Sequence, residues 1–150
     1  LTVDVTAKRR GAEALHVTVV GDGGSQVGLA VGSERLEAQQ YEVDVAQGSS
    51  SQRPQVRTRF DGLALAMKLH PLANGMLAYE VQGQFASPTA RRARAANRVG
   101  GAGLVATDTA RLMVDERGVA RATGEGEWKI LLGDRTGQGM RVSMTIRATP

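Results

Sequence analysis

Residues 62–85 read GLALAMKLHPLANGMLAYEVQGQF and decide the fold, because they predict a complete antiparallel hairpin. Apolar side chains recur at every second position before the turn and again after it, which is the period of a strand with one buried face. Pro71 cannot donate to a strand ladder, and Asn74-Gly75 favours the type I′ turn of a short hairpin. The alternating apolar positions are Leu63, Leu65, Met67 and Leu69, then Leu77, Tyr79, Val81 and Phe85.

The same alternation extends from this hairpin in both directions along the chain. Glycine turns separate the alternating segments, and no long amphipathic helix interrupts them. The sequence therefore predicts one all-β domain over residues 1–150: an antiparallel β-sandwich or barrel-like sheet of about 8–10 short strands, completed within the chain or across subunits. The further strand segments lie near Val3–Ala7, Leu15–Val19, Val27–Val31, Tyr41–Val45, Ala110–Val114, Val119–Thr123, Trp128–Leu132 and Met140–Ile146.

Between these segments the pattern predicts turns and loops. Glycine, serine and proline favour such breaks, because they suit turn backbones or interrupt a ladder. We expect a hairpin turn at Gly21–Gly24, a short helix or irregular edge over 33–40, and a loop at Gly48–Pro54. We also expect a flexible, exposed loop over 87–103 and a turn at Asp115–Gly118.

Composition narrows the class of protein. Aromatic residues make up only 3% of the 150 residues and cysteine is absent, so the chain has neither disulfides nor thiolate metal sites. No apolar run reaches the ~18 residues that a membrane-spanning helix needs. The first residues lack the charged start and apolar core of a signal peptide, so we expect a mature or trimmed chain.

The sequence predicts no catalytic, cofactor or metal site. Only His16 and His70 offer an imidazole base, and each lies in a strand pattern where a structural role is expected. Glu42 and Asp44 fall on one strand face, where paired carboxylates are usually solvated. Gly21–Gly24 follows a strand as phosphate loops do, but another strand pattern comes next in place of a helix. We therefore expect no enzyme and no cofactor.

A dense basic run lies at Arg91, Arg92, Arg94 and Arg98. The net charge of +4 permits binding to nucleic acid or anionic lipid. No aromatic residue interleaves the run, so the stacking platform of single-strand binders is missing. The sequence favours a solvated or partner-facing basic loop over a nucleic-acid site.

The stretch 41–85 resembles the core of the secretin family, the outer-membrane ring proteins of type II and III secretion and pilus systems. In that family an extended segment and a loop lead into a G-x-x-L-x-V-x-P strand, a turn and a long returning strand. Residues 62–71, GLALAMKLHP, take the place of that strand here. The positions that match are Tyr41, Val43, Pro54, Gly62, Leu63, Leu65, Pro71, Asn74 and Gly75.

This resemblance implies a structural, self-assembling subunit of a cell-envelope ring or pore, in the outer membrane or periplasm. It implies a homo-oligomer that serves protein transport, contacts other envelope proteins and meets the membrane through its assembly. The alternative from the residues alone is a β-sandwich shell or binding module outside the secretin family, such as a virion, surface-layer or partner-binding domain.

Overall fold

The computed structural model describes residues 1–46, 49–92, 105–133 and 139–149. It confirms the all-β fold class: apart from one short 3-10 turn between β4 and β5, every element in the described residues is a strand. The elements are β1 (Thr2–Arg9), β2 (Leu15–Val20), β3 (Gln26–Ala46), β4 (Ser49–Pro71), η1 (Ala73–Gly75), β5 (Met76–Arg92), β6 (Val105–Arg121), β7 (Glu127–Leu132) and β8 (Met140–Arg147).

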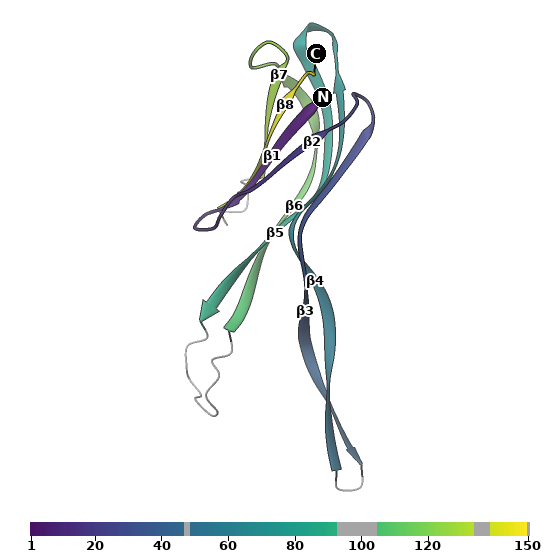
Figure 1. The fold of residues 1–150 in the computed structure, drawn as a ribbon, viewed down its shortest axis with the longest axis vertical. Coiled ribbons are helices and arrows are strands. Elements are labelled where there is room, and N and C mark those ends of the chain that lie inside the picture. Colours follow the sequence, from purple (N-terminus) through teal and green to yellow (C-terminus); the bar gives the residue numbers. More distant parts are fainter. Residues whose placement is uncertain (47–48, 93–104, 134–138, 150) are drawn as a thin grey trace.

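The strands form two antiparallel four-stranded sheets that face each other (Figure 1). Sheet A has the order β2-β1-β8-β7, and sheet B is the meander β3-β4-β5-β6. Neither sheet closes into a barrel within the described residues, so the sandwich form of the expected fold is the one present.

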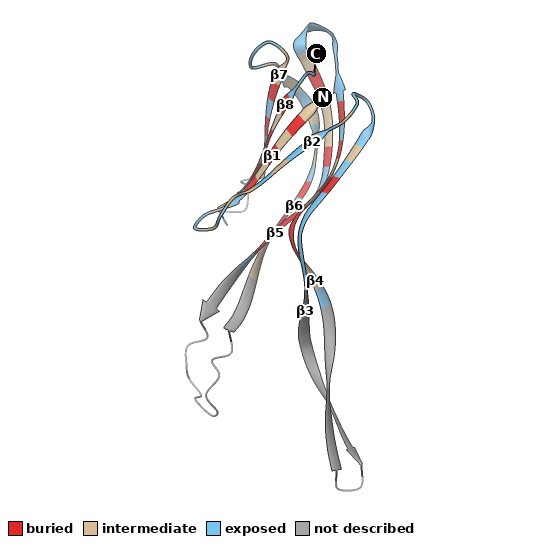
Figure 2. Ribbon diagram, in the orientation of Figure 1, coloured by how far each residue is buried: buried red, intermediate tan, exposed pale blue. Residues whose placement is uncertain are grey.

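One apolar core fills the space between the sheets. Valine, leucine, isoleucine and methionine dominate it, because alternate residues of both sheets point inward. The buried residues lie where the sheets overlap and extend along sheet B to the point where it divides (Figure 2). Among the most deeply buried are Leu63, Met67, Leu77, Leu132, Met140, Met144 and Ile146.

Four of the strands are much longer than expected. β3 and β4 have 21 and 23 residues, and β5 and β6 have 17 each, against about 5–6 for an ordinary strand. The short helix expected over 33–40 is wrong, because these residues pair with β4. The alternative expectation, an irregular edge, is the one present: β3 is an edge strand of sheet B, and its pairing shifts register between Ala38 and Gln40. Backbone pairing with a neighbouring strand overrides the local helical preference of this segment.

Two expected loops are also partly strand. Ser49 to Pro54 pair with β3, so the loop expected at Gly48–Pro54 is wrong over those residues. Pro54 lies opposite Tyr41, in a part of β4 that pairs with β3 but not with β5. Strands that have a neighbour on only one side are where proline is tolerated in a sheet. Ser87 to Arg92 pair with β6, so the loop expected over 87–103 is wrong there. The rest of that expected loop, residues 93–103, lies outside the described residues.

Two expected turns have other roles. Gly21–Gly24 does not form a hairpin, because β2 belongs to sheet A and β3 to sheet B, so the segment links the two sheets. Asp115–Gly118 lies inside β6. A Cβ at Gly118 would come within 2.9 Å of the Tyr79 hydroxyl oxygen, so the glycine makes room for the Tyr79 ring.

The turn expected at Asn74-Gly75 is present. Asn74 has φ 63° and Gly75 has φ 69°, the positive values that both central residues of a type I′ turn require. The backbone N–H of Leu72 donates to the carbonyl oxygen of Met76 at 2.7 Å and closes the loop between β4 and β5.

Candidate assembly surface

Sheet B divides at a row of small residues that we call the fork: Gly32 on β3, Gly62 on β4 and Ala86 on β5. Gly62 pairs with both of the others, and the pairing of β4 with β5 ends there. A Cβ at Gly62, whose φ is +144°, would lie 2.2 Å from the carbonyl oxygen of Val31. Only glycine permits the β3 and β4 backbones to come this close.

Beyond the fork the sheet continues as two separate hairpins (Figure 1). The first arm comprises residues 33–46 of β3 and 49–61 of β4. The second arm comprises residues 87–92 of β5 and 105–110 of β6. Within the described residues each arm is only two strands wide, and a two-stranded ribbon is marginally stable in water.

The fork also holds the buried polar residues of the described chain, Asp61 and Ser87, which are 5% and 7% exposed. The guanidinium of Arg9, at the end of β1, donates from Nη1 to the carbonyl oxygen of Ser87 at 2.9 Å. This bond joins sheet A to the start of the second arm and satisfies a carbonyl where the sheet divides.

Within the described residues, each sheet leaves two strands unpaired on one side. The edge strands are β2 and β7 in sheet A and β3 and β6 in sheet B. Edge strands present unpaired N–H and C=O groups, so they are ready to pair with a strand of another chain. Because both sheets contain an even number of antiparallel strands, the two edges of each sheet run in opposite directions.

Large apolar side chains that are exposed in the described part gather on these edge strands. Met113 and Val119 on β6 are 70% and 55% exposed, and Leu36 on β3 is 78% exposed. Apart from Leu72 in the β4–β5 turn, the full set lies on the four edge strands: Val20, Val31, Leu36, Met113, Val119 and Leu131. An apolar edge of this kind favours association with another strand.

The outer face of sheet A carries a chain of polar contacts across its four strands. Thr18 donates to Asp4 at 2.6 Å, and Arg147 contacts both Asp4 at 2.6 Å and Glu127 at 3.2 Å. Lys129 lies 3.3 Å from Glu127.

These contacts shift the pKa values of the charged groups. The hydrogen bond from the Thr18 hydroxyl, followed by the interaction with Arg147, lowers the pKa of Asp4. Hydrogen bonds from Arg147 and Lys129 lower the pKa of Glu127. The two carboxylates raise the pKa of Arg147. All of these groups face water, as expected of a solvated sheet face.

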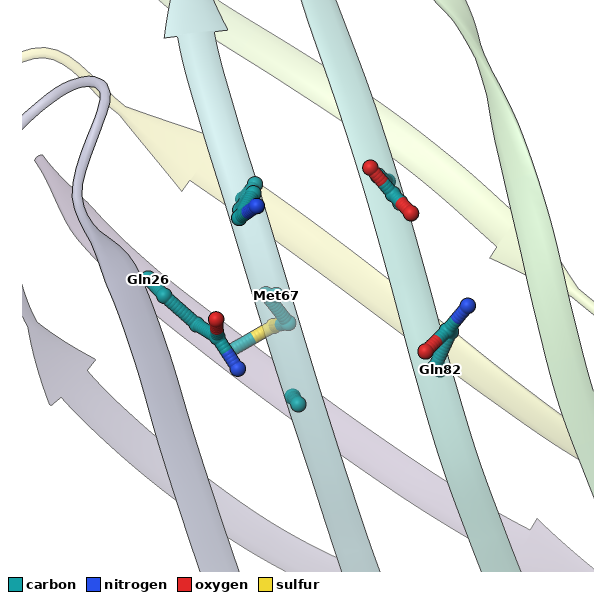
Figure 3. A pocket seen from close by; sticks show the side chains of 6 residues that line it. Gln26, Met67 and Gln82 are labelled. Atoms are coloured by element: carbon teal, nitrogen blue, oxygen red, sulfur yellow. The ribbon is translucent and has the colours of Figure 1, made fainter.

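The hollows on sheet B are small or shallow. The one in Figure 3 has a volume of about 80 Å³ and is lined by side chains of β3, β4 and β5, including Gln26, Met67 and Gln82. Ligand pockets usually enclose about 300–1,000 Å³. A larger hollow of about 510 Å³, which includes Tyr79 and Val119, is open along the outer face.

No group of three or more metal-ligating side chains occurs in the part of the chain that the structure describes. His16 bonds to the Thr6 hydroxyl at 3.1 Å, and His70 is exposed near the end of β4. Across residues 1–46, 49–92, 105–133 and 139–149, no helix is long and apolar enough to cross a membrane.

The secretin-matching residues lie on two strands and one turn. Tyr41 is on β3 opposite Pro54 of β4, and Val43 is opposite Gln52. Gly62 is at the fork. Leu63 and Leu65 are buried in the core and Pro71 ends β4 ahead of the Asn74-Gly75 turn. The structure thus places these residues along the β3–β4 pair and in the turn that leads from β4 into β5.

The basic run is divided by the limits of the described chain. Arg91 and Arg92 end β5, where their backbones pair with Ala106 and Val105. Arg94 and Arg98 lie outside the described residues. The structure therefore does not test the predicted basic loop.

Sequence reasoning missed the fork and, apart from the irregular edge expected over 33–40, the edge strands. The apolar residues Leu36, Met113 and Val119 read as ordinary members of strands, because alternation does not show which strand lies at an edge. The pair Gly32 and Gly62 carried a signal, since two glycines inside strand patterns mark a bulge or a close backbone approach.

Comparisons with known proteins give a loose likeness of fold. No known protein family matches the sequence, and no curated protein matches it either. Among solved structures, the chain is similar to the InvG secretin-domain β-barrel from the Salmonella SPI-1 injectisome NC-base, with a TM-score of 0.37 and 8% identity over 96% of this chain. The chain spans 55% of the length of that InvG chain.

Proposed function

We propose that this chain is a structural, self-assembling subunit of a secretin-like ring or pore in the cell envelope, in the outer membrane or periplasm. Copies join edge to edge, with β6 of one copy beside β3 of the next. The proposal assigns no catalytic step and no cofactor to the chain. Protein transport and contacts with other envelope proteins belong to the same proposal.

The observation that carries the proposal is the placement of exposed apolar side chains on edge strands. In sheet B, Val31 and Leu36 lie on one edge strand and Met113 and Val119 on the other. Monomeric proteins usually protect their edges with charges, prolines or bulges. An edge that exposes methionine and valine at 70% and 55% is suited to burial by a second chain.

Strand direction supports head-to-tail joining. Because sheet B has four antiparallel strands, β3 and β6 run in opposite directions. A rotated second copy therefore offers its β3 antiparallel to the first copy's β6, which extends the antiparallel ladder without a break. Repetition of this contact closes a ring when the rotation between copies closes.

The arms need partners of the same kind. Each arm continues past the fork as a two-stranded ribbon, which is marginal by itself. Neighbouring copies would place arm beside arm, and each ribbon would then gain ladder bonds on its open sides. Self-assembly thus gives each arm, beyond Gly62, the neighbouring strands that a single copy does not provide.

The first test is the mass of the purified protein by light scattering, with electron micrographs of the same sample. Rings of many copies are the expected result. A monomer at every concentration would overturn the proposal, and a closed shell or filament would favour a shell module instead.

The second test uses cysteine pairs, for which the chain is suited because it has no native cysteine. Gly28→Cys on β3 is combined with Asp115→Cys on β6, and a short bismaleimide is added. An added Cβ at Gly28 meets nothing within 4 Å, so the change is tolerated. Because the register between copies is unknown, a second pair replaces Asp115→Cys with Arg117→Cys.

Head-to-tail joining predicts a ladder of trimers and larger products from the double variants. Each single variant should give no covalently cross-linked product, because equivalent residues of neighbouring copies are a whole four-stranded sheet apart. Dimers from the single variants would instead indicate a symmetric edge contact and contradict the ring.

A further inference from the structure

The outer face of sheet A has two ends with opposite electrostatic character. At one end, Asp4 and Glu127 neutralise Arg147 through the contacts described above. At the other end Lys8 and Arg141 lie directly opposite each other on β1 and β8, and Arg10 follows just past the end of β1, beside Gly139. Figure 1 shows β1 and β8 side by side along this face.

Three cations line one hollow at this second end, which we call the cationic hollow: Lys8, Arg10 and Arg141 around the backbone of Gly139. Its volume is about 210 Å³. No carboxylate lines it, and the three side chains form no ion pair or side-chain hydrogen bond with another described residue.

The backbone holds the cations together. Arg10 donates its N–H to the carbonyl oxygen of Gly139 at 2.9 Å, which closes the end of the β1–β8 ladder. Gly139 has φ +66°, and a Cβ there would lie 2.8 Å from the Arg10 Cβ. The Arg10 stem therefore packs over the Gly139 backbone and is held beside Lys8 and Arg141.

Like charges directly opposite each other on a ladder destabilise the pair. An arrangement of three cations without a carboxylate is relieved when an anion binds among them. Guanidinium groups donate in a planar fork that suits the oxygens of phosphate, and the lysine ammonium adds a point charge. The hollow, at about 210 Å³, has room for several water molecules of about 30 Å³ each, and so also for a phosphate group.

We propose that Lys8, Arg10 and Arg141 form a binding site for a phosphate group, either as free inorganic phosphate or as the headgroup of an anionic lipid. The site does not depend on the edge-to-edge assembly, because it lies on the outer face of sheet A. Its ligand is a phosphate oxyanion in both cases, and the two sources are distinguished by experiment.

The first arm of the test is a titration of the nitrogen-15-labelled protein with inorganic phosphate at constant ionic strength, maintained with chloride. We expect amide shifts to saturate at Lys8, Arg10, Gly139 and Arg141. We expect Arg141→Gln to weaken binding about fivefold, the upper range for one exposed ion pair. Arg121→Gln, which removes an exposed cation of β6, should leave binding unchanged.

The second arm is co-flotation with vesicles of phosphatidylglycerol in phosphatidylcholine. Membrane partitioning should fall about fivefold for each cation of the hollow that is replaced, and Arg121→Gln is again the control. Phosphate binding without flotation would assign the site to free phosphate. Flotation without phosphate binding would assign it to a lipid headgroup.

Thermal melts at low ionic strength check that the variants fold. Arg141→Gln and Lys8→Gln should melt at the same temperature as the parent or higher, because each removes a like-charge contact. Phosphate should raise the melting temperature of the parent more than that of either variant. The proposal is overturned if neither phosphate nor vesicles bind, or if Arg121→Gln weakens binding as much as Arg141→Gln does.

Discussion

The indole Nε1 of Trp128 donates a hydrogen bond of 3.0 Å to the carbonyl oxygen of Gly75, and so ties β7 of sheet A to the β4–β5 turn of sheet B. The same carbonyl accepts the backbone N–H of Ala122 at 2.9 Å. Trp128 is 5% exposed, so its ring also fills the core at this end of the sandwich. The turn that the sequence predicted thus serves as a contact between the sheets.

Replacing Trp128 tests this link. Trp128→Phe should lower the free energy of unfolding by about 1–2 kcal/mol, because it removes the hydrogen bond and leaves most of the packing. Trp128→Ala should cost about 3–5 kcal/mol through the cavity it leaves. Urea denaturation followed by far-ultraviolet circular dichroism measures both, since the variants have no tryptophan to report. Equal stability of Trp128→Phe and the parent would show that the bond contributes nothing.

Gly62 at the fork should tolerate no side chain. Its φ of +144° and the 2.2 Å between an added Cβ and the Val31 carbonyl oxygen require the β3 and β4 backbones to move. Gly62→Ala should cost on the order of 4 kcal/mol or more, or prevent folding, and ring assembly should be lost with it. Gly28→Ala on the same strand pair is the control, because its Cβ meets nothing within 4 Å. A stable, assembling Gly62→Ala variant would contradict the close approach at the fork.

Acid should weaken the polar contacts of sheet A. The pKa values of Asp4 and Glu127 lie below their ordinary values of 3.8 and 4.5 in the folded chain. The lowered pKa values mean that the folded chain stabilises the ionised carboxylates. The resulting contribution to folding stability is present above the ordinary pKa values and is lost as the pH falls through the folded-state values. Arg147→Gln should therefore be less stable than the parent near neutral pH.

The stability difference between Arg147→Gln and the parent should shrink as the pH falls from about 5 toward 2. Denaturant midpoints measured at several pH values follow this change. Arg121→Gln is a matched control, because Arg121 is exposed on β6 away from the network. A difference that stays constant with pH would show that the two carboxylates do not act through Arg147.

The apolar edge of β6 can be altered without touching the core. Met113→Lys with Val119→Lys places charges on an edge strand, which is how monomeric sheets resist edge pairing. We expect the double variant to fold with unchanged stability within about 0.5 kcal/mol and to be monomeric by light scattering. Leu72→Lys, at an exposed apolar residue off the edge strands, should assemble like the parent. Rings from the Met113/Val119 variant would show that this edge is not the contact.

The sequence by itself determined the all-β class and the central hairpin. Alternation from Leu63 to Leu69 and from Leu77 to Phe85 requires one buried face, and those faces form the core of sheet B. Asn74-Gly75 determined the turn, because a positive φ at two successive residues is inexpensive only for such pairs. The one resemblance found in the sequence, over residues 41–85, includes this hairpin and extends back through β4 into the end of β3.

Only the tertiary structure decided which strands share a sheet, where each strand ends and which strands lie at an edge. Gly21–Gly24 has the composition of a hairpin turn, yet it links two sheets, because β2 pairs with β1 in sheet A whereas β3 pairs with β4 in sheet B. Residues 33–40 have local helical character and become strand because β4 lies beside them. The Arg9–Ser87 bond joins residues 78 positions apart. Alternation reports that a face is buried, but partner choice depends on long-range pairing that no local pattern encodes.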